Sequence, residues 1–186
     1  MRFLTTMMAA TIALAGAAAA QAPKALDPNN TLVLELKGGK VAIQLRPDLA
    51  PKHVERVKQL AKDGFYNGLK WHRVINGFMA QSGDPTGTGT SGSKYGNIPA
   101  EFTQEPFVRG TVGAARTSDP NSANSQFFIC FTDTGCASLR GQYTVWGKVV
   151  DGMAAVDAIA KGEAGSGRVA TPDQIVKGYI AAAAPR

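Results

Sequence analysis

The sequence predicts a mainly β domain, a closed or nearly closed antiparallel barrel with helices at its ends. Three observations support this fold class. Short segments of alternating apolar and polar residues recur along the chain, only two isolated stretches show helical spacing, and there is no repeating β-α-β unit. A length of 186 residues is enough for one domain with a proper core.

The first 20 residues are typical of a secretory signal peptide. Arg2 precedes an uncharged apolar run that ends in small residues at Ala18, Ala19 and Ala20. An uncleaved membrane anchor is the alternative, because about 20 apolar residues can span a bilayer. The weakly hydrophobic, Ala-rich second half favours cleavage, so we expect an exported protein without membrane attachment.

The net charge excludes little, but its distribution argues against nucleic acid as a partner. Cleavage after residue 20 removes only Arg2 and lowers the formal charge from +6 to +5. Basic residues are scattered singly, and no basic stretch is interleaved with aromatic residues. A solvated, mildly basic surface explains this pattern.

The mature chain begins with a leader and a hairpin. Residues 21–30 are polar, contain proline and lack periodicity, which is typical of a flexible segment. Apolar residues at every second position of 32–36 and 41–45 predict two strands, and Gly38 with Gly39 is expected to form the turn between them.

Helical spacing follows the hairpin. Pro51 suits a first helical position, apolar residues at 54, 57, 60 and 61 share one face, and Gly64 can end the helix. His53 belongs to this helix and is expected to face solvent.

The rest of the chain predicts more strands and one more helix. Asp151 can cap this second helix, and Met153, Val156 and Ile159 form its apolar stripe. An Ala-rich tail, 181–186, ends the chain. The additional strands are expected over 69–75, 78–82, 107–115, 126–131, 143–149 and 171–180.

Two stretches, 71–84 and 125–131, hold most of the information about function. Alternate residues of a strand point the same way, so Met79 shares a face with Gln81, and Gln126 with Phe128. Arg73 stands on a third expected strand. If these faces meet, they form a shallow apolar pocket with a few polar groups, as in small-ligand or peptide sites.

A glycine pattern in the following loop could be mistaken for a nucleotide site. Gly87, Gly89 and Gly92 match a dinucleotide fingerprint. Phosphate binding needs a helix directly after such a loop, whereas this loop runs into residues 95–99, which include a proline. The pattern therefore does not indicate a nucleotide site.

Ser125, His72 and Asp84 have the residue types of a hydrolase triad. The nucleophile motif G-x-S-x-G is missing, and ordinary buried polar residues of a barrel explain all three. We therefore expect His72 to be structural.

Cys130 and Cys136 are the only cysteines. An oxidising compartment would permit a disulfide, but the required geometry is demanding for one residue on a strand and one in the next loop, so the pairing stays open. A metal site is less favoured, because His53 and His72 lack a matching ligand spacing.

Longer runs indicate a family. WHRVINGFMAQSGDPTGTG from Trp71, ARTSDPNSANSQFFICF from Ala115 and YTVWGKVVDGM from Tyr143 resemble the cyclophilin family of peptidyl-prolyl cis-trans isomerases. The resemblance runs from about Thr31 to about Gly178 and is strongest to the exported bacterial branch.

The resemblance implies a closed antiparallel barrel of eight strands capped by two helices, over residues 31–180, with a substrate groove on its outer surface. Arg73 and Gln81 take the catalytic positions. The implied substrate is a proline-containing polypeptide, with no cofactor and no metal, and we expect a monomer in the bacterial periplasm or, alternatively, a secreted one. The implied substrate-binding residues are Phe78, Met79, Thr117, Gln126, Phe128, Leu139 and Tyr143.

Three positions depart from the best-studied members. Ser138 replaces a tryptophan and predicts weak binding of cyclosporin, and Tyr143 replaces a histidine near the pocket. Arg116 adds a second cation beside the groove, and its role is not implied by the family.

We therefore expect an isomerase that acts on folding or unfolded exported proteins. The alternative is a non-catalytic proline-binding chaperone, although a pure binder has no physical need for a cation aimed at the proline nitrogen. A barrel enclosing a small apolar ligand is least favoured, because Phe127, Ile129 and Val145 suit core filling.

Overall fold

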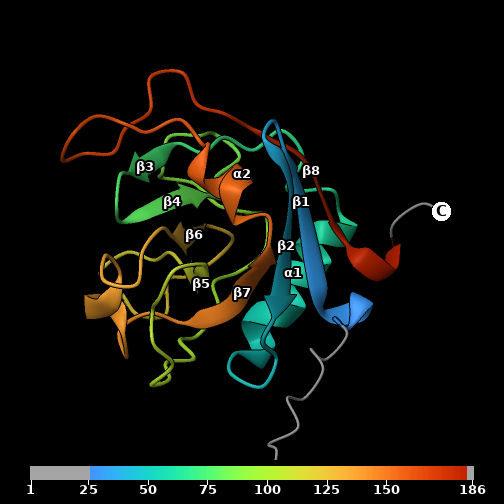
Figure 1. Ribbon diagram of the computed structural model, residues 1–186. Helices are drawn as coiled ribbons and strands as arrows, with labels where there is room; N and C mark the ends of the chain where they lie inside the picture. Colours follow the sequence, from blue (N-terminus) through green and yellow to red (C-terminus); the bar gives the residue numbers. More distant parts are fainter. Residues whose placement is uncertain (1–25, 184–186) are drawn as a thin grey trace, which may run out of the picture.

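A computed structural model describes residues 26–183, which form one eight-stranded antiparallel sheet and two α-helices (Figure 1). The strand order is β3-β4-β6-β5-β7-β2-β1-β8. The strands are β1 (Thr31–Leu36), β2 (Gly39–Leu45), β3 (Arg73–Ile75), β4 (Met79–Ser82), β5 (Thr111–Ala114), β6 (Phe127–Cys130), β7 (Val145–Asp151) and β8 (Ile175–Ile180).

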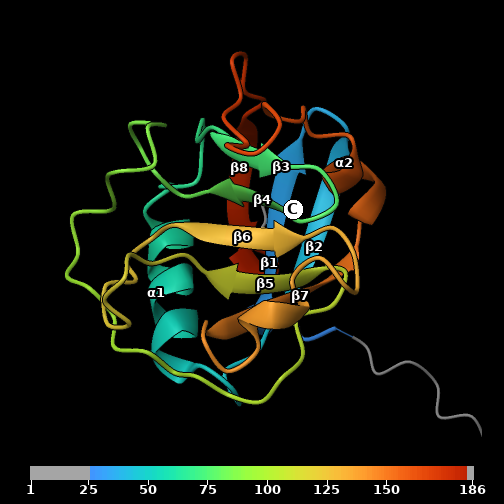
Figure 2. The same cartoon turned by 90° about the vertical axis from the view of Figure 1, so that its left-hand side faces the viewer.

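The sheet curls strongly, so that β3, β4, β6, β5 and β7 form one layer in front of β1, β2 and β8 (Figure 2). In the described part of the chain, β3 and β8 do not pair as strands. The segment before β3 does meet the start of β8 and the residues before it: the amide of Ile175 donates to the carbonyl of Leu69 at 2.8 Å, and that of Trp71 to the carbonyl of Asp173 at 2.9 Å. The closed barrel expected from the sequence is thus observed as a curled, open sheet.

The two helices lie at opposite ends of the curled sheet (Figure 2). Helix α1 (Pro51–Lys62) begins with Pro51 and ends before Gly64, whose φ of +68° suits a residue without a Cβ. Its apolar face at 54, 57, 60 and 61 is buried, as the spacing predicts. Helix α2 (Met153–Asp157) is shorter than expected: Gly152 is its N-cap, Asp151 belongs to β7, and Ile159 lies beyond its end.

Aromatic side chains fill the interior between the layers. Phe127 packs edge to face against Tyr66, Trp71 and Trp146, with ring centroids 5.7 to 6.0 Å apart. All four are at most 2% exposed. Because the interior is filled in this way, a ligand site has to lie on the surface of the sheet.

His53 differs from the expectation that it faces solvent. It is 2% exposed, and its Nδ1 lies 2.6 Å from Glu101, whose carboxylate also accepts the backbone N–H groups of Lys52 and His53. Glu101 therefore satisfies the free donors at the start of α1 from a loop 48 residues away in sequence.

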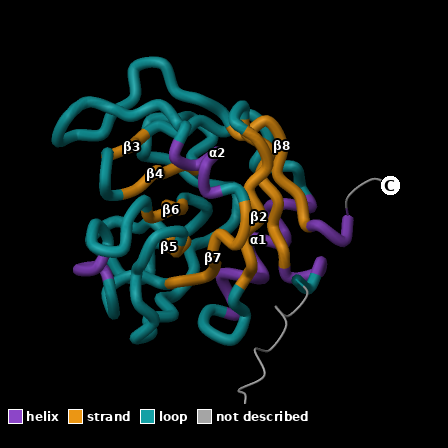
Figure 3. Tube along the Cα trace, viewed as in Figure 1, coloured by secondary structure: helices purple, strands orange, loops and turns teal. Residues whose placement is uncertain are grey.

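Several boundaries also differ from the predictions. The expected strands over 69–75 and 107–115 are shorter, and the hairpin turn is Lys37-Gly38, since Leu36 pairs with Gly39. Long loops gather on the side of β3 to β6 (Figure 3). One of them, 83–96, contains the glycine pattern and is not followed by a helix.

The ends of the described chain pack together. Residues 28–30 and 181–183 each form a single 3-10 turn, so the end of the expected leader has regular structure. The signal peptide expected over 1–20 lies outside the described residues. Within 26–183, neither helix is long and apolar enough to cross a membrane.

Candidate active site

Three neighbouring strands bring the predicted polar and apolar site residues into one row. Arg73 on β3 stands opposite Gln81 on β4, and Gln81 stands opposite Phe128 on β6. Met79 lies two residues before Gln81, and Gln126 two residues before Phe128. The faces inferred from alternation therefore do meet on one surface.

A small pocket of about 100 Å³ opens over this row. Phe128 forms its floor: its ring stacks on Phe107 with centroids 5.8 Å apart and meets Tyr143 edge to face at 5.8 Å. Both Met79 and Phe128 are under 5% exposed, so the pocket is a shallow apolar depression. Its lining is Arg73, Phe78, Met79, Gln81, Ala115, Arg116, Phe128, Leu139 and Tyr143.

The guanidinium of Arg73 is held at the rim by two acceptors. Its Nη1 donates to Oε1 of Gln81 at 3.3 Å, and its Nε donates to the carbonyl of Ser166 at 3.2 Å. Among the described residues, Nη2 has no partner. A permanently charged donor is thus fixed in orientation beside an apolar pocket.

A second, more polar pocket of about 520 Å³ adjoins the first. Gln126 and Thr117 line this larger pocket, whereas Ala115 and Arg116 line both. The hydroxyl of Thr117 donates to Ser122 at 2.8 Å. The two predicted residues that do not border the apolar pocket therefore line the adjoining one.

Arg116 forms the wall between the pockets. Its guanidinium carbon lies 4.5 Å from the ring centroid of Tyr143, and its Nη2 donates to the carbonyl of Gln142 at 2.9 Å. It therefore fastens the end of the loop that carries Leu139 and Tyr143. This role of Arg116 could not be inferred from the sequence.

The beginning of that loop is fastened by a disulfide between Cys130 and Cys136. Cys130 is on β6, two residues after Phe128, and Cys136 precedes the short 3-10 turn η2 (Ala137–Leu139). Both sulfur-bearing residues are fully buried beneath the apolar pocket, and Ser138 in η2 is exposed.

The hydrolase triad imagined from the sequence is not assembled. Ser125 donates to the carbonyl of Gly83 at 2.7 Å, and the ring nitrogens of His72 have no hydrogen-bond partner among the described residues. Burial lowers the pKa of His72. Burial alone would raise the pKa of Asp84, but the hydroxyl and N–H of Thr86 with other backbone donors outweigh it and lower the value to about 2.

Sequence reasoning missed three contributors to the site. Ala115 lines both pockets, and the carbonyl of Ser166 orients Arg73 from a loop 93 residues away in sequence. Gly113 stands opposite Phe128, and a Cβ there would lie 2.5 Å from the Phe128 ring. Only the position of Gly113 on a predicted strand could have indicated its importance.

An apolar depression with a few polar groups at its edge is typical of a ligand-binding site. The family described as "Cyclophilin type peptidyl-prolyl cis-trans isomerase/CLD" matches residues 31–179. The chain therefore belongs to the cyclophilin family and is a peptidyl-prolyl cis-trans isomerase.

Individual relatives agree with this assignment. A probable peptidyl-prolyl cis-trans isomerase of Brucella suis is 54% identical over 98% of both chains. One of Helicobacter pylori is 41% identical over 67% of this chain and 77% of its own.

Solved cyclophilins share the fold. One from Hirschia baltica has a TM-score of 0.76 at 26% identity, covering 86% of this chain and 77% of its own. One from Cryptosporidium parvum, determined in the presence of the dipeptide Ala-Pro, has a TM-score of 0.72 at 28% identity, covering 81% and 98%.

Proposed function

We propose that the protein rotates X-Pro bonds of exported polypeptides by stabilising the twisted amide without covalent chemistry. The observation that carries this proposal is the row formed by Arg73, Gln81 and Phe128, which puts a fixed cation beside an apolar pocket. The Cryptosporidium parvum cyclophilin determined in the presence of Ala-Pro supports a proline-containing peptide as the ligand.

The chemical task is to lower a rotational barrier. Partial double-bond character gives a peptide bond a barrier of about 18–20 kcal/mol, and uncatalysed X-Pro isomerisation takes tens of seconds or more. As the bond twists, the proline nitrogen loses conjugation and gains a lone pair. A donor that reaches this lone pair stabilises the twisted state more than either planar state.

In this proposal Arg73 is that donor. Its Nε and Nη1 are occupied by Ser166 and Gln81, which leaves Nη2 for the substrate. The guanidinium keeps its charge at every working pH, so its donors are always available. Because a tenfold rate increase needs about 1.4 kcal/mol, one such hydrogen bond in a desolvated groove provides a substantial part of the catalysis.

The apolar pocket would hold the proline ring while the preceding carbonyl rotates. Phe78, Met79, Phe128, Leu139 and Tyr143 supply the burial. Gln126 and the chain near Thr117 border the adjoining pocket and would fix the backbone on that side. The ring is anchored and one end of the peptide is held, so only the X-Pro bond is left to turn.

The test is turnover of a peptide containing Ala-Pro-Phe in a protease-coupled assay. Arg73→Ala should lower kcat/KM about 100-fold or more while the far-UV circular dichroism stays unchanged, because the twisted amide loses its donor. Unchanged turnover would overturn the mechanism.

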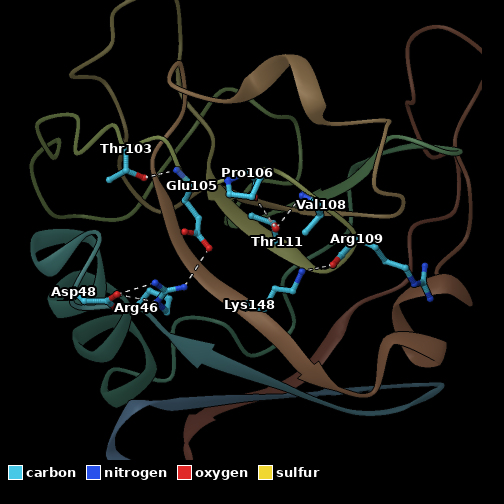
Figure 4. Close-up of polar contacts among 9 residues, drawn as sticks. All are labelled: Arg46, Asp48, Thr103, Glu105, Pro106, Val108, Arg109, Thr111 and Lys148. Carbon is cyan, nitrogen blue, oxygen red and sulfur yellow. Dashed lines mark hydrogen bonds and ion pairs between the residues drawn. The ribbon is translucent and has the colours of Figure 1, made fainter. Parts of the chain in front are cut away.

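Arg46→Ala is the matched control. Arg46 also forms charged hydrogen bonds, to Asp48 at 2.7 Å and to Glu105 at 3.3 Å, but in a separate polar cluster after β2 (Figure 4). Its loss should leave kcat/KM within about twofold of the wild type, because Arg46 lines neither pocket and surface ion pairs contribute little to the stability of the fold.

Export is the second part of the proposal. It is supported by the signal-like sequence of residues 1–20 and by the Cys130–Cys136 disulfide, which suits an oxidising compartment. The mature protein recovered from a bacterial periplasm should begin at Gln21. A cytoplasmic protein that retains residues 1–20 would contradict export.

We also propose that the curled sheet behaves as a closed barrel. The hydrogen bonds of Trp71 to Asp173 and of Ile175 to Leu69 support this. The amide protons of Trp71 and Ile175 should then exchange as slowly as those within the paired strands. Rapid exchange of both would contradict closure.

A further inference from the structure

The loop after β4 is built around one buried carboxylate. Asp84 is 1% exposed, and no ion pair to it is found within the described residues. One oxygen, Oδ1, accepts the N–H of Thr86 at 2.7 Å and its hydroxyl at 2.8 Å. The other, Oδ2, accepts the N–H groups of Gly89, Thr90 and Ser91 at 2.6, 3.0 and 3.3 Å. Asp84 therefore fixes where loop 85–91 places its own carbonyl groups.

Two of those carbonyls begin a chain of hydrogen bonds that ends at the active site. Nε2 of Gln126 donates to the carbonyls of Gly89 and Ser91 at 3.1 and 2.8 Å. Oε1 of Gln126 accepts from Nε2 of Gln81 at 2.9 Å, and Oε1 of Gln81 accepts from Nη1 of Arg73 at 3.3 Å.

The ends of this chain determine the orientation of the amides in the middle. A backbone carbonyl can only accept, and a guanidinium can only donate. Gln126 must therefore turn its NH₂ toward the loop, which turns its oxygen toward Gln81, and Gln81 must then present its oxygen to Arg73. If the loop carbonyls move away, Gln126 can flip, and Gln81 can then direct an N–H group at the guanidinium.

We propose that Asp84 is a positioning residue for the isomerase reaction. It holds the loop carbonyls that orient Gln126, and through Gln126 and Gln81 it sets the orientation of Arg73. The inference rests on the proposed role of Arg73, but it assigns to a buried loop residue a function that no contact with the substrate would reveal.

Asp84→Asn is the first test. An asparagine keeps the shape but replaces one oxygen by an NH₂ group, so it cannot accept the donors on both sides. It should lower kcat about tenfold with KM changed less than about twofold, because Arg73 acts on the twisted state while the apolar pocket stays intact.

A double-mutant cycle distinguishes positioning from general stability. In a Gln126→Leu background the link to Arg73 is already broken, so adding Asp84→Asn should lower kcat less than about twofold further. A full tenfold effect in that background would overturn the proposal.

Two further variants keep the test decisive. Asp27→Asn is the matched control. Asp27 also accepts a backbone N–H, that of Asn29 at 2.9 Å, but it lies before β1 and outside the site. This variant should leave kcat unchanged. If Asp84→Asn fails to fold, Thr86→Val removes the hydroxyl that donates to Oδ1 of Asp84, together with its contact to the Thr88 hydroxyl, and goes through the same cycle. A loss of kcat that persists undiminished with Gln126→Leu would overturn the proposal there too.

The outcomes also separate this inference from the proposed function. If Arg73→Ala retains full turnover, the mechanism fails. If Arg73→Ala is inactive but Asp84→Asn has the kcat of the wild type, only the positioning role fails.

Discussion

Gly113 shows how a missing side chain shapes the site. A Cβ at this position would lie 2.5 Å from the Phe128 ring and 2.8 Å from Phe107. The stacked pair of rings, and with it the floor of the apolar pocket, therefore requires glycine.

Gly113→Ala should displace Phe128 and raise KM about tenfold, with a stability loss of about 1–3 kcal/mol from overpacking. Peptide turnover together with urea unfolding measures both effects. Gly96→Ala is the control, since a Cβ there meets nothing within 4 Å and should change neither. An unaltered KM in Gly113→Ala would show that the rings can move at no cost to the pocket.

At this scale the sequence predicts the residues that follow a strand's alternation. Met79 shares a face with Gln81, and Gln126 with Phe128, because side chains alternate along a strand. The register that sets Gln81 opposite both Arg73 and Phe128 belongs to the strand pairing, which alternation does not specify. His53 was placed wrongly because its helical position lies near the buried stripe, and the partner that makes its burial tolerable, Glu101, comes from a distant loop. A polar residue is buried only where it has such a hydrogen-bond partner, and the spacing of apolar residues along a helix does not show whether a distant partner exists.

Among the elements, the loop that carries Leu139 is held by cross-links at both of its ends. The disulfide constrains the start of this loop, and the hydrogen bond of Arg116 to the carbonyl of Gln142 constrains its end. Neither constraint is encoded in local propensity. The predicted strand boundaries are wrong for a related reason. Residues 69–72 hydrogen-bond to residues 169–175 through irregular backbone, so a sequence that suits an extended strand does not form a regular strand pair there.

The variant Cys130→Ala/Cys136→Ala tests this constraint. Opening a short covalent loop should cost about 2 kcal/mol of stability by loop-closure entropy, measured by urea unfolding. KM should rise severalfold because Leu139 is less well placed, while kcat changes little because Arg73 is untouched. If KM stays constant, the disulfide supports the fold alone and not the pocket.

The whole molecule should lose stability in two steps as the pH falls. Burial lowers the pKa of His53 and outweighs the hydrogen bond to the Glu101 carboxylate, which would raise it; burial also lowers the pKa of His72. Below about pH 6.5 the histidines of the unfolded chain take up protons, whereas both buried rings stay neutral in the folded protein. Their contribution to the free energy of unfolding is therefore complete above about pH 6.5 and is lost below it. Asp84 has a pKa of about 2, so it adds to the free energy of unfolding above about pH 4, and this stabilisation is lost between about pH 4 and 2.

Urea midpoints at pH 7.5 and pH 5 measure the first step. The midpoint of the wild type should be lower at pH 5, and a variant with His53→Gln and His72→Gln should show a smaller difference between the two pH values. Equal differences in both proteins would assign the step to other groups.

The pairing of β1 with β8 has a consequence for connectivity. Leu32 stands opposite Ile180, so the two ends of the domain leave the sheet side by side, and neither strand belongs to the site. A short linker should therefore join them, and the exposed turn at Lys37-Gly38 offers a place to open new termini. A circular permutant beginning at Gly39 should thus keep the catalytic row intact, although β8 would then be synthesised before β1.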